Sequence, residues 1–103
     1  MATYAKIVLS GSTDGRGILI DDDATAGKTV HTGSATATTY DEVWIYAANY
    51  DSSDRKLTVE WGSAAAGDII EVTIPTEAGL VLVIPGLIIK GNSTPLVVKA
   101  FAA

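Results

Sequence analysis

The chain has 103 residues, enough to bury roughly 60 to 70% of its unfolded surface around one core, so we expect a single domain over residues 1–103. Twelve acidic and seven basic side chains give a net charge of −5, which disfavours a nucleic-acid partner because phosphate backbones attract basic surfaces. The absence of cysteine excludes disulfides and thiolate metal sites. No apolar run approaches the roughly 20 residues that span a bilayer, so we expect a soluble protein without membrane association.

Residues 1–39 are predicted to contain two short strands and a flexible connection. The alternation of Ala2–Ser10 predicts a first strand, which ends in the turn-rich stretch that follows it. Residues 17–20, Gly-Ile-Leu-Ile, predict a second strand. Small and polar side chains dominate residues 21–39, which predicts a long connection with one weak strand near Lys28–Thr32.

Residues 40–62 are predicted to form a hairpin around which the rest of the chain is organised. Val43–Ala48 is apolar and aromatic on both faces, so we expect a strand that is covered on both sides. Lys56–Trp61 alternates instead, which predicts a strand with one buried face, including Trp61, and one solvated face. Between them, the Asn-, Asp- and Ser-rich residues 49–54 predict a turn.

Three further segments complete the predicted fold. Ile69–Ile74 and Thr94–Phe101 alternate between apolar and polar or small positions, as one-sided strands do. Leu80–Lys90 is interrupted by Pro85-Gly86, so it predicts either two strands or one bent strand. Because no window shows a helical period, we predict an all-β fold of about seven or eight strands. The expected architecture is an antiparallel β-sandwich, with the jelly roll as one possible form and a small barrel as the alternative.

Three motifs that could carry chemistry have simpler interpretations. Residues 26–29, Ala-Gly-Lys-Thr, match the end of a phosphate-binding loop, but position 22 lacks the first glycine and no helix is predicted to follow. Asp21–Asp23 lacks the spacing of a calcium loop and is predicted to be an exposed acidic loop, with a shared calcium contact left open. His31 is the only histidine and is interpreted as a surface residue rather than a catalytic relay. We therefore predict no enzyme, no cofactor and no metal.

Four aromatic side chains lie in or near the predicted hairpin and offer a sugar-binding platform as one interpretation: Trp44, Tyr46, Tyr50 and Trp61. Packing in the core or in a subunit interface is the competing interpretation. It is favoured because Trp61 is in phase with the buried face of its strand and Trp44 lies within an apolar run. Tyr50, in the turn, is predicted to be the exposed aromatic and is the candidate for a glycan contact.

An ordered set of segments carries a resemblance to a known family: Glu42–Asn49, Leu57–Gly62, Asp68–Pro75, Gly79–Lys90 and Leu96–Ala103. Together, and with the Val-Glu-Trp-Gly end of the second segment, they resemble small structural proteins of tailed bacteriophage virions over about residues 40–103. Members of this family are β-sandwich proteins that decorate or cement the head, or sit at the neck or tail.

The resemblance implies a capsid decoration or cement protein at the virion surface. Its expected partners are the major capsid protein and other copies of itself in a homo-oligomer. The N-terminal segment often makes the contacts that differ between members, which gives a set of candidate interface residues: Tyr4, Ile7, Leu9, Ile18, Ile20 and Val30. A composition of 48% apolar and only 18% charged residues is consistent with surfaces buried between proteins. A tail or neck component is the first alternative, and a small carbohydrate-binding or host-adhesion module is the second.

Overall fold

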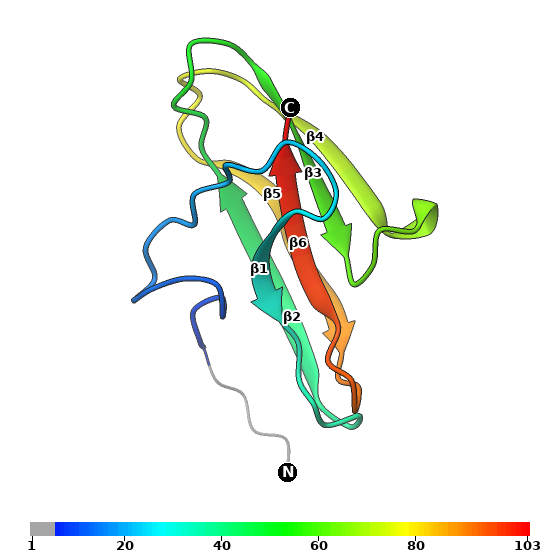
Figure 1. The fold of residues 1–103 in the computed structure, drawn as a ribbon. Helices are drawn as coiled ribbons and strands as arrows, with labels where there is room; N and C mark the ends of the chain where they lie inside the picture. The colour runs from blue at the N-terminus through cyan, green and yellow to red at the C-terminus, as the bar shows by residue number, and fades with distance from the viewer. Residues whose placement is uncertain (1–5) are drawn as a thin grey trace.

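The computed structural model describes residues 6–103, and these residues form six β-strands and one short 3-10 helix, η1 (Figure 1). The strands are β1 Lys28–Thr32, β2 Tyr40–Ala47, β3 Arg55–Trp61, β4 Ile69–Ile74, β5 Val81–Lys90 and β6 Val97–Ala102, and η1 spans Ala66–Asp68. All strand pairings are antiparallel. The prediction of an all-β, antiparallel fold is confirmed.

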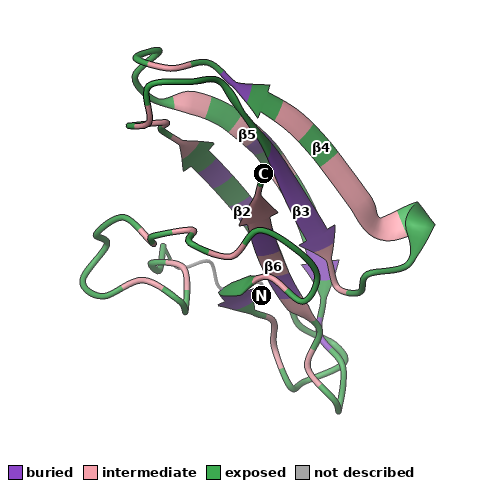
Figure 2. Cartoon of the chain, turned by 45° about the horizontal axis from the view of Figure 1, so that its top comes forward, coloured by how far each residue is buried: buried purple, intermediate pink, exposed green. Residues whose placement is uncertain are grey.

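The strands form two sheets that share one core. The four-stranded sheet has the order β1-β6-β3-β4, and the two-stranded sheet pairs β2 with β5. Buried side chains from both sheets belong to a single cluster: Val30, Val43, Ile45, Leu57, Val59, Ile74, Ile84, Ile89, Val98 and Ala100. Figure 2 shows these buried positions along the strands of both sheets. Burial of this cluster is the main favourable contribution to folding because it removes apolar surface from water.

The predicted hairpin of residues 40–62 is wrong, although both of its strands are present. β2 pairs with β5, whereas β3 lies between β4 and β6 in the other sheet. The link between β2 and β3 therefore crosses from one sheet to the other. Sequence alternation identifies a strand from its own side chains, but a strand's partners depend on contacts that are distant in the sequence.

β5 is one continuous strand that is bent at Pro85-Gly86. In its pairing with β2, Val43 lies opposite Leu87 and the next residue, Trp44, lies opposite Pro85, so Gly86 is an extra residue. Gly86 has a φ of 83°, which glycine adopts without the steric cost that other residues have. This bulge settles the choice left open by the sequence in favour of one bent strand.

The predicted solvated face of β3 is buried at Thr58 and Glu60, whereas Lys56 is exposed as predicted. Thr58 and Glu60 alternate with the core residues Leu57 and Val59, yet each is only 3% exposed. The segment before β1 folds over this side of the sheet, where Ala102 donates its backbone N–H to the carbonyl of Asp22 at 3.0 Å. A strand that is covered on both faces can still show alternation when its second cover comes from a polar loop.

The N-terminal part differs most from the predicted secondary structure. Residues 17–20 are not in a strand, and of the predicted strand Ala2–Ser10, residues 6–9 are also outside any strand while Met1–Ala5 lie outside the described residues. The weak strand predicted near Lys28–Thr32 is confirmed as β1. Gly11 donates its N–H to the carbonyl of Val30 at 2.9 Å, so the chain before β1 is attached to the outer edge of that strand.

Two loops at one end of the molecule are tied together by Asn49. Its side-chain amide donates to the carbonyls of Ser53 and Ile74, both at 2.9 Å, and its carbonyl side-chain oxygen accepts the N–H of Asp51 at 2.8 Å. Asp54 accepts the N–H of Thr76 at 3.0 Å. The connection from β2 to β3 is therefore bonded to the connection from β4 to β5, so the two crossings between the sheets hold each other in place.

Candidate interaction surfaces

The outer face of the β2–β5 sheet carries a row of exposed aromatic side chains. Tyr40, Trp44 and Tyr46 occupy outward positions on β2 and are 60%, 51% and 55% exposed, and Glu42 occupies the outward position between Tyr40 and Trp44. The cross-strand partners of the outward β2 positions are Lys90, Ile88, Pro85 and Leu82. We define the aromatic face by its apolar members: Tyr40, Trp44, Tyr46, Leu82, Pro85 and Ile88.

Trp44 is held in a fixed position at the centre of the aromatic face. Its indole Nε1 donates a hydrogen bond to Oε1 of Glu42 at 2.8 Å. A Cβ atom on Gly86 would lie only 2.9 Å from Cζ2 of the indole ring, so the ring lies across the bare backbone of the bulge. Glycine at the bulge and the carboxylate beside it thus orient the ring before any partner arrives, which lowers the entropy cost of binding.

The prediction that Val43–Ala48 is covered on both sides is wrong for the single chain, which covers only one side of this strand. Val43 and Ile45 face the core and are 3% and 9% exposed, but Trp44 and Tyr46 face outward and are about half exposed. The four-stranded sheet covers only the inner side of β2 and β5. Trp61, in contrast, packs against the core cluster, as predicted.

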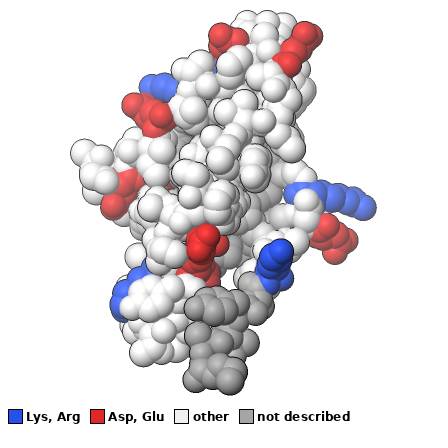
Figure 3. Space-filling view, turned by 180° about the vertical axis from the view of Figure 1, so that it is seen from behind, with Lys and Arg blue, Asp and Glu red and all other residues white. Residues whose placement is uncertain are grey.

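Charged side chains lie mostly at the margins of the side that β2 and β5 occupy. Figure 3, seen from behind relative to Figure 1, shows a broad central region without Lys, Arg, Asp or Glu and charges around it. The exposed apolar side chains of the aromatic face are of the kind that other proteins cover.

His31 is buried, with 4% of its surface exposed, so its interpretation as a surface residue is wrong. Its Nδ1 accepts the backbone N–H of Ser10 at 3.1 Å, and its Nε2 therefore donates to Oδ2 of Asp41 at 2.8 Å. The Ser10 hydroxyl accepts the N–H of Thr32 at 2.6 Å. Ser10 thus meets the imidazole through its backbone, not its hydroxyl, and the cluster joins the N-terminal segment, β1 and β2. The pattern of β1 gave no signal for this because the segment that buries His31 is distant in the sequence.

Glu60 is a buried carboxylate at the outer side of the four-stranded sheet. Its Oε1 accepts the backbone N–H of Gly27 at 2.9 Å. A Cβ atom on Gly27 would lie 2.3 Å from the carbonyl oxygen of Ala100, so only glycine lets the segment approach β6 this closely. Gly27 therefore has a packing role, for which its distant partner Glu60 gave no local signal in the sequence.

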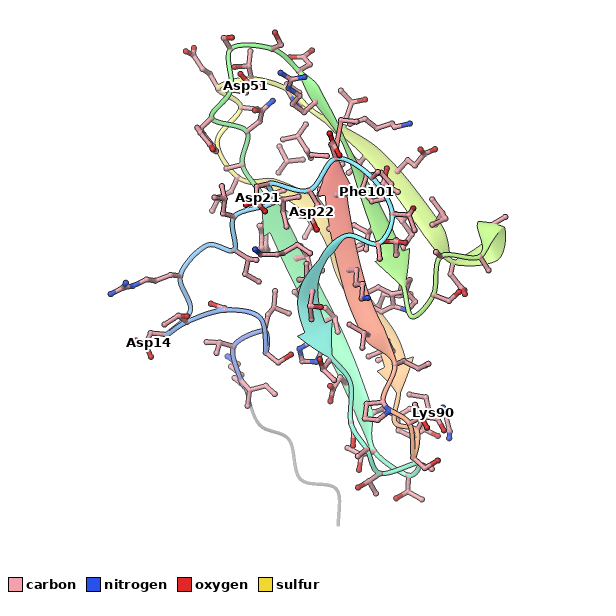
Figure 4. The ribbon with its side chains drawn as sticks, in the orientation of Figure 1. Asp14, Asp21, Asp22, Asp51, Lys90 and Phe101 are labelled. Atoms are coloured by element: carbon pink, nitrogen blue, oxygen red, sulfur yellow. The ribbon has the colours of Figure 1, made fainter. Side chains whose placement is uncertain are left out.

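The acidic loop before β1 makes one ion pair and one backbone contact with the sheet. Asp21 lies 3.6 Å from Nζ of Lys28, and the backbone carbonyl of Asp22 bonds to β6 as described above. Figure 4 shows both aspartates near the end of β6. Lys28 begins a strand, whereas the lysine of a phosphate-binding loop lies at the start of a helix. Among residues 6–103, no group of three or more His, Asp or Glu side chains is placed to hold a metal ion.

The candidate interface residues of the N-terminal segment fall into three groups. Ile7 is 74% exposed and remains available to a partner. Leu9, Ile18 and Ile20 are half-buried and pack against the core. Val30 is 5% exposed and belongs to the core, which removes it from the candidate set because it has no free surface to offer; Tyr4 lies outside the described residues.

Tyr50 is 88% exposed, as expected for the loop between β2 and β3, and its contact with a glycan stays a prediction. Next to it, Asp51 accepts a hydrogen bond from Nε of Arg55 at 2.7 Å and another from the N–H of Ser52 at 2.7 Å. These two bonds, that of Arg55 first, lower the pKa of the Asp51 carboxyl below its usual range. The loop thus presents an aromatic ring on a locally bonded turn.

Two shallow depressions lie side by side near the end of β3. The first has a volume of about 410 Å³ and includes Glu60 and Lys99 in its lining, and the second, of about 290 Å³, includes Trp61 and Ile88. Both are open to solvent, so neither encloses a ligand as an enzyme cleft does. In the part of the chain that the structure describes, no helix is long and apolar enough to cross a membrane.

Comparison with known proteins adds no relative. No protein-family model, curated protein or solved structure matches the chain.

Proposed function

We propose that this chain is a structural protein of a tailed-bacteriophage virion, and specifically a capsid decoration or cement protein. Each copy would bridge adjacent capsid subunits and add buried interface area that opposes the internal pressure of the packaged DNA. Its partners would be the major capsid protein and other copies of itself. The work is mechanical, so the relevant property of the molecule is the surface that it can bury.

The observation that carries this proposal is the amount of exposed apolar surface. Twelve large hydrophobic side chains of residues 6–103 are exposed, and they gather on more than one surface. One group is the aromatic face. A second group belongs to the N-terminal segment and consists of Ile7, Val8 and Leu19, of which Val8 and Leu19 are 52% and 55% exposed. Two separate apolar surfaces suit a protein that contacts more than one neighbour.

We also propose a finer description of the fold than the all-β, antiparallel arrangement. The two sheets would pack as a β-sandwich, because residues of β2 and β5 and residues of the four-stranded sheet share one core cluster. A jelly-roll connection stays a prediction. In this arrangement the N-terminal segment lies beside the sheets and is free to contact a capsid.

The DNA that flanks the gene gives the first test of the proposed function. A neighbouring gene for a major capsid protein, a portal or a scaffold supports head decoration. Tail genes on both sides would move the protein to the neck or tail. Flanking genes for carbohydrate-active enzymes or secretion would overturn the virion proposal.

A binding experiment then tests the attachment surface. Shells assembled from the neighbouring capsid protein are mixed with the purified chain and sedimented. We expect the wild-type chain to sediment with the shells and the variant Ile7→Asp to lose most of its binding, because a charge in an apolar contact must be desolvated. Leu80→Asp is the matched control, since Leu80 is also 74% exposed but lies outside the N-terminal segment. Equal loss in both variants would contradict attachment through this segment.

A further inference from the structure

We propose that the outer edge of β4 is a self-association site, at which β4 of a second copy pairs with it in the antiparallel direction. The pairing would join the two four-stranded sheets into one continuous sheet. Its two-fold axis would be perpendicular to the sheet, which keeps the core-facing sides of both copies on the same side. The inference rests on the proposed function only in taking copies of the chain as partners. Its tests use the isolated protein, so their failure would leave attachment to a capsid through the N-terminal segment untouched.

β4 is the last strand of the four-stranded sheet, and within residues 6–103 it pairs with β3 alone. It lies at the margin of the molecule in both ribbon views (Figures 1 and 2). The bonds of β3 determine which way the backbone groups of β4 point. Lys56 exchanges both of its backbone hydrogen bonds with Ala103, on the β6 side, and successive residues of an antiparallel strand bond to opposite sides. Leu57 and Val59 therefore bond to β4.

Through those bonds, Val72 and Ile70 of β4 face β3. The alternate residues Ile69, Glu71 and Thr73 consequently turn their backbone N–H and carbonyl groups away from the sheet. Within residues 6–103, no backbone hydrogen bond reaches these groups. A row of unpaired backbone groups on an outer strand is a template for another strand.

The other outer edges carry features that hinder strand addition. The edge of β1 is occupied in part by the N-terminal segment, where Gly11 donates its N–H to the carbonyl of Val30. The pairing of β2 with β5 is interrupted by extra residues at Val83 and Gly86, and β5 also contains Pro85, which has no N–H to donate. Bulges twist an edge away from a flat template. β4 has none of these features, because its pairing with β3 is continuous over its whole length and its sequence lacks proline and lysine.

The side chains of β4 select one register for the two copies. Because outward backbone groups must meet outward groups, two registers pair most of the strand, one centred on Glu71 and one centred on Val72. The register centred on Glu71 sets two carboxylates directly opposite each other, which is destabilising. The register centred on Val72 instead sets Glu71 opposite the partner's Thr73. In that register no like charges of β4 lie directly opposite each other.

In the register centred on Val72, the core-facing side chains of the two copies continue each other. Val72 lies opposite the partner's Val72, and Ile70 lies opposite the partner's Ile74. All of these side chains are β-branched and suit neighbouring positions in a sheet. The two pairs of Glu71 with Thr73 each exchange two backbone hydrogen bonds. The edge is thus complementary to itself, which favours a second copy over an unrelated strand.

Pairing along this edge gives a weak dimer and no larger assembly. It buries less than the roughly 800 Å² per partner of a standard interface, so we expect a dissociation constant on the order of 100 µM. Each chain offers one such edge and the pair uses both, so association stops at two copies. Copies held side by side on a shell meet at effective concentrations in roughly the millimolar range, at which a pair of this strength forms.

Sedimentation equilibrium with charge variants of Thr73 tests the proposal. For the wild type we expect the average mass to rise from 10.6 kDa toward twice that value at about 1 mM. Thr73→Glu sets a second carboxylate opposite the partner's Glu71 in both pairs and should weaken association about tenfold, whereas Thr73→Lys should strengthen it. A wild type that stays monomeric, or a Thr73→Glu variant that pairs as strongly as Thr73→Lys, would overturn the inference.

The stability of the single chain separates this effect from a general loss of folding. Within one copy Thr73 lies opposite Lys56, so in urea Thr73→Glu should stabilise the monomer slightly and Thr73→Lys should destabilise it slightly. Self-association is expected to change in the opposite direction. Association that follows the stability of the monomer would contradict pairing at β4.

Introduced cysteines test the register, because the natural chain has none. Val72 meets the partner's Val72 in a pair without hydrogen bonds, where the Cα atoms lie about 4.5 Å apart, within the range of a disulfide. Val72→Cys chains should therefore cross-link under mild oxidation. Ile70→Cys is the matched control on the same half-buried side, and it should cross-link slowly because Ile70 lies opposite the partner's Ile74. Faster cross-linking of Ile70→Cys than of Val72→Cys would contradict the proposed axis.

Amide hydrogen exchange identifies the occupant of the edge. The amides of Glu71 and Thr73 should gain protection as the concentration of the isolated chain rises, because they become bonded only in the pair. The amide of Val72 is the internal control, since it faces β3 already and should change little. Protection of Glu71 and Thr73 that appears only after shells of the capsid protein are added would assign the edge to a capsid strand and overturn self-pairing.

Discussion

The outer faces of the two sheets differ in what covers them. On the four-stranded sheet, the segment of residues 21–27 folds over β3 and β6, and Glu60 beneath it is 3% exposed. The remaining outer positions there include the ion pair of Lys56 and Glu71, at 2.8 Å. On the two-stranded sheet the outer face is aromatic, and its central residue Trp44 is 51% exposed.

The difference reverses the usual distribution of side chains. The polar face has a cover from its own chain, and the apolar face has none among residues 6–103. Polar groups under a loop are stable only when their hydrogen bonds are made, as that of Glu60 with Gly27 is. An aromatic face gains free energy from any cover that removes it from water. The molecule's own loop therefore covers the four-stranded sheet, where buried polar groups need specific hydrogen bonds. The aromatic face of the two-stranded sheet remains available to a partner.

The cover of the four-stranded sheet can be broken at Gly27. The Gly27→Ala substitution would place a Cβ atom 2.3 Å from the carbonyl oxygen of Ala100, so the segment must move away and Glu60 loses its donor. We expect the free energy of unfolding, measured in urea, to fall by about 3 kcal/mol. Gly17→Ala is the control, because nothing lies within 4 Å of its added Cβ. A Gly27→Ala chain as stable as the Gly17→Ala chain would mean that the segment packs differently.

The attachment of the N-terminal segment can be broken at His31. His31→Ala removes the acceptor of the Ser10 N–H and the donor to Asp41 and leaves a small void, so we expect a loss of about 2 kcal/mol. Relative to the wild type, amide hydrogen exchange in the variant should accelerate more at Ser10 and Gly11 than at the amides of β3. If exchange at these amides is unchanged, the segment is held by other contacts, and His31 is only a core residue.

The sequence predicted strands well and their surroundings poorly, for one physical reason. Ile69–Ile74 shows its strand through a local alternation of side chains, which needs no knowledge of the partner. The burial of His31 and Glu60 comes from segments that fold over them from at least 20 residues away in the sequence. Likewise, the apolar outer positions of β2 predicted a cover, and the chain described here does not provide one. That mismatch was the local sequence signal for an interaction surface on this sheet.

The aromatic face should contribute little to the stability of a single chain. Trp44→Ala removes a ring that packs only on the bulge and a hydrogen bond at the surface, so at low concentration we expect a loss of at most about 1 kcal/mol. Urea unfolding at low protein concentration measures this value. A loss as large as that of Gly27→Ala would mean that the face supports the monomer, and the contrast between the two sheets would fail.

The smallest expected effect lies in the loop between β2 and β3, which joins the sheets. Arg55 and Ser52 hold the pKa of Asp51 below its usual value, while in the unfolded chain the carboxyl should titrate near pH 3.9. The folded state therefore binds this proton less readily than the unfolded state. Its contribution to stability is present above about pH 4 and is lost as the pH falls through the lowered pKa of the folded state.

The melting temperatures of the wild type and of Asp51→Asn measure this contribution. We expect the wild type to melt slightly higher at pH 7 and the difference to shrink between about pH 4 and pH 2. In an Arg55→Gln background, Asp51→Asn should change the melting temperature much less, since the Arg55 hydrogen bond is the first cause of the lowered pKa of Asp51. Parallel melting curves at every pH would show that the loop bond adds nothing. The bond of Arg55 to Asp51 thus reports on the connection between the two sheets.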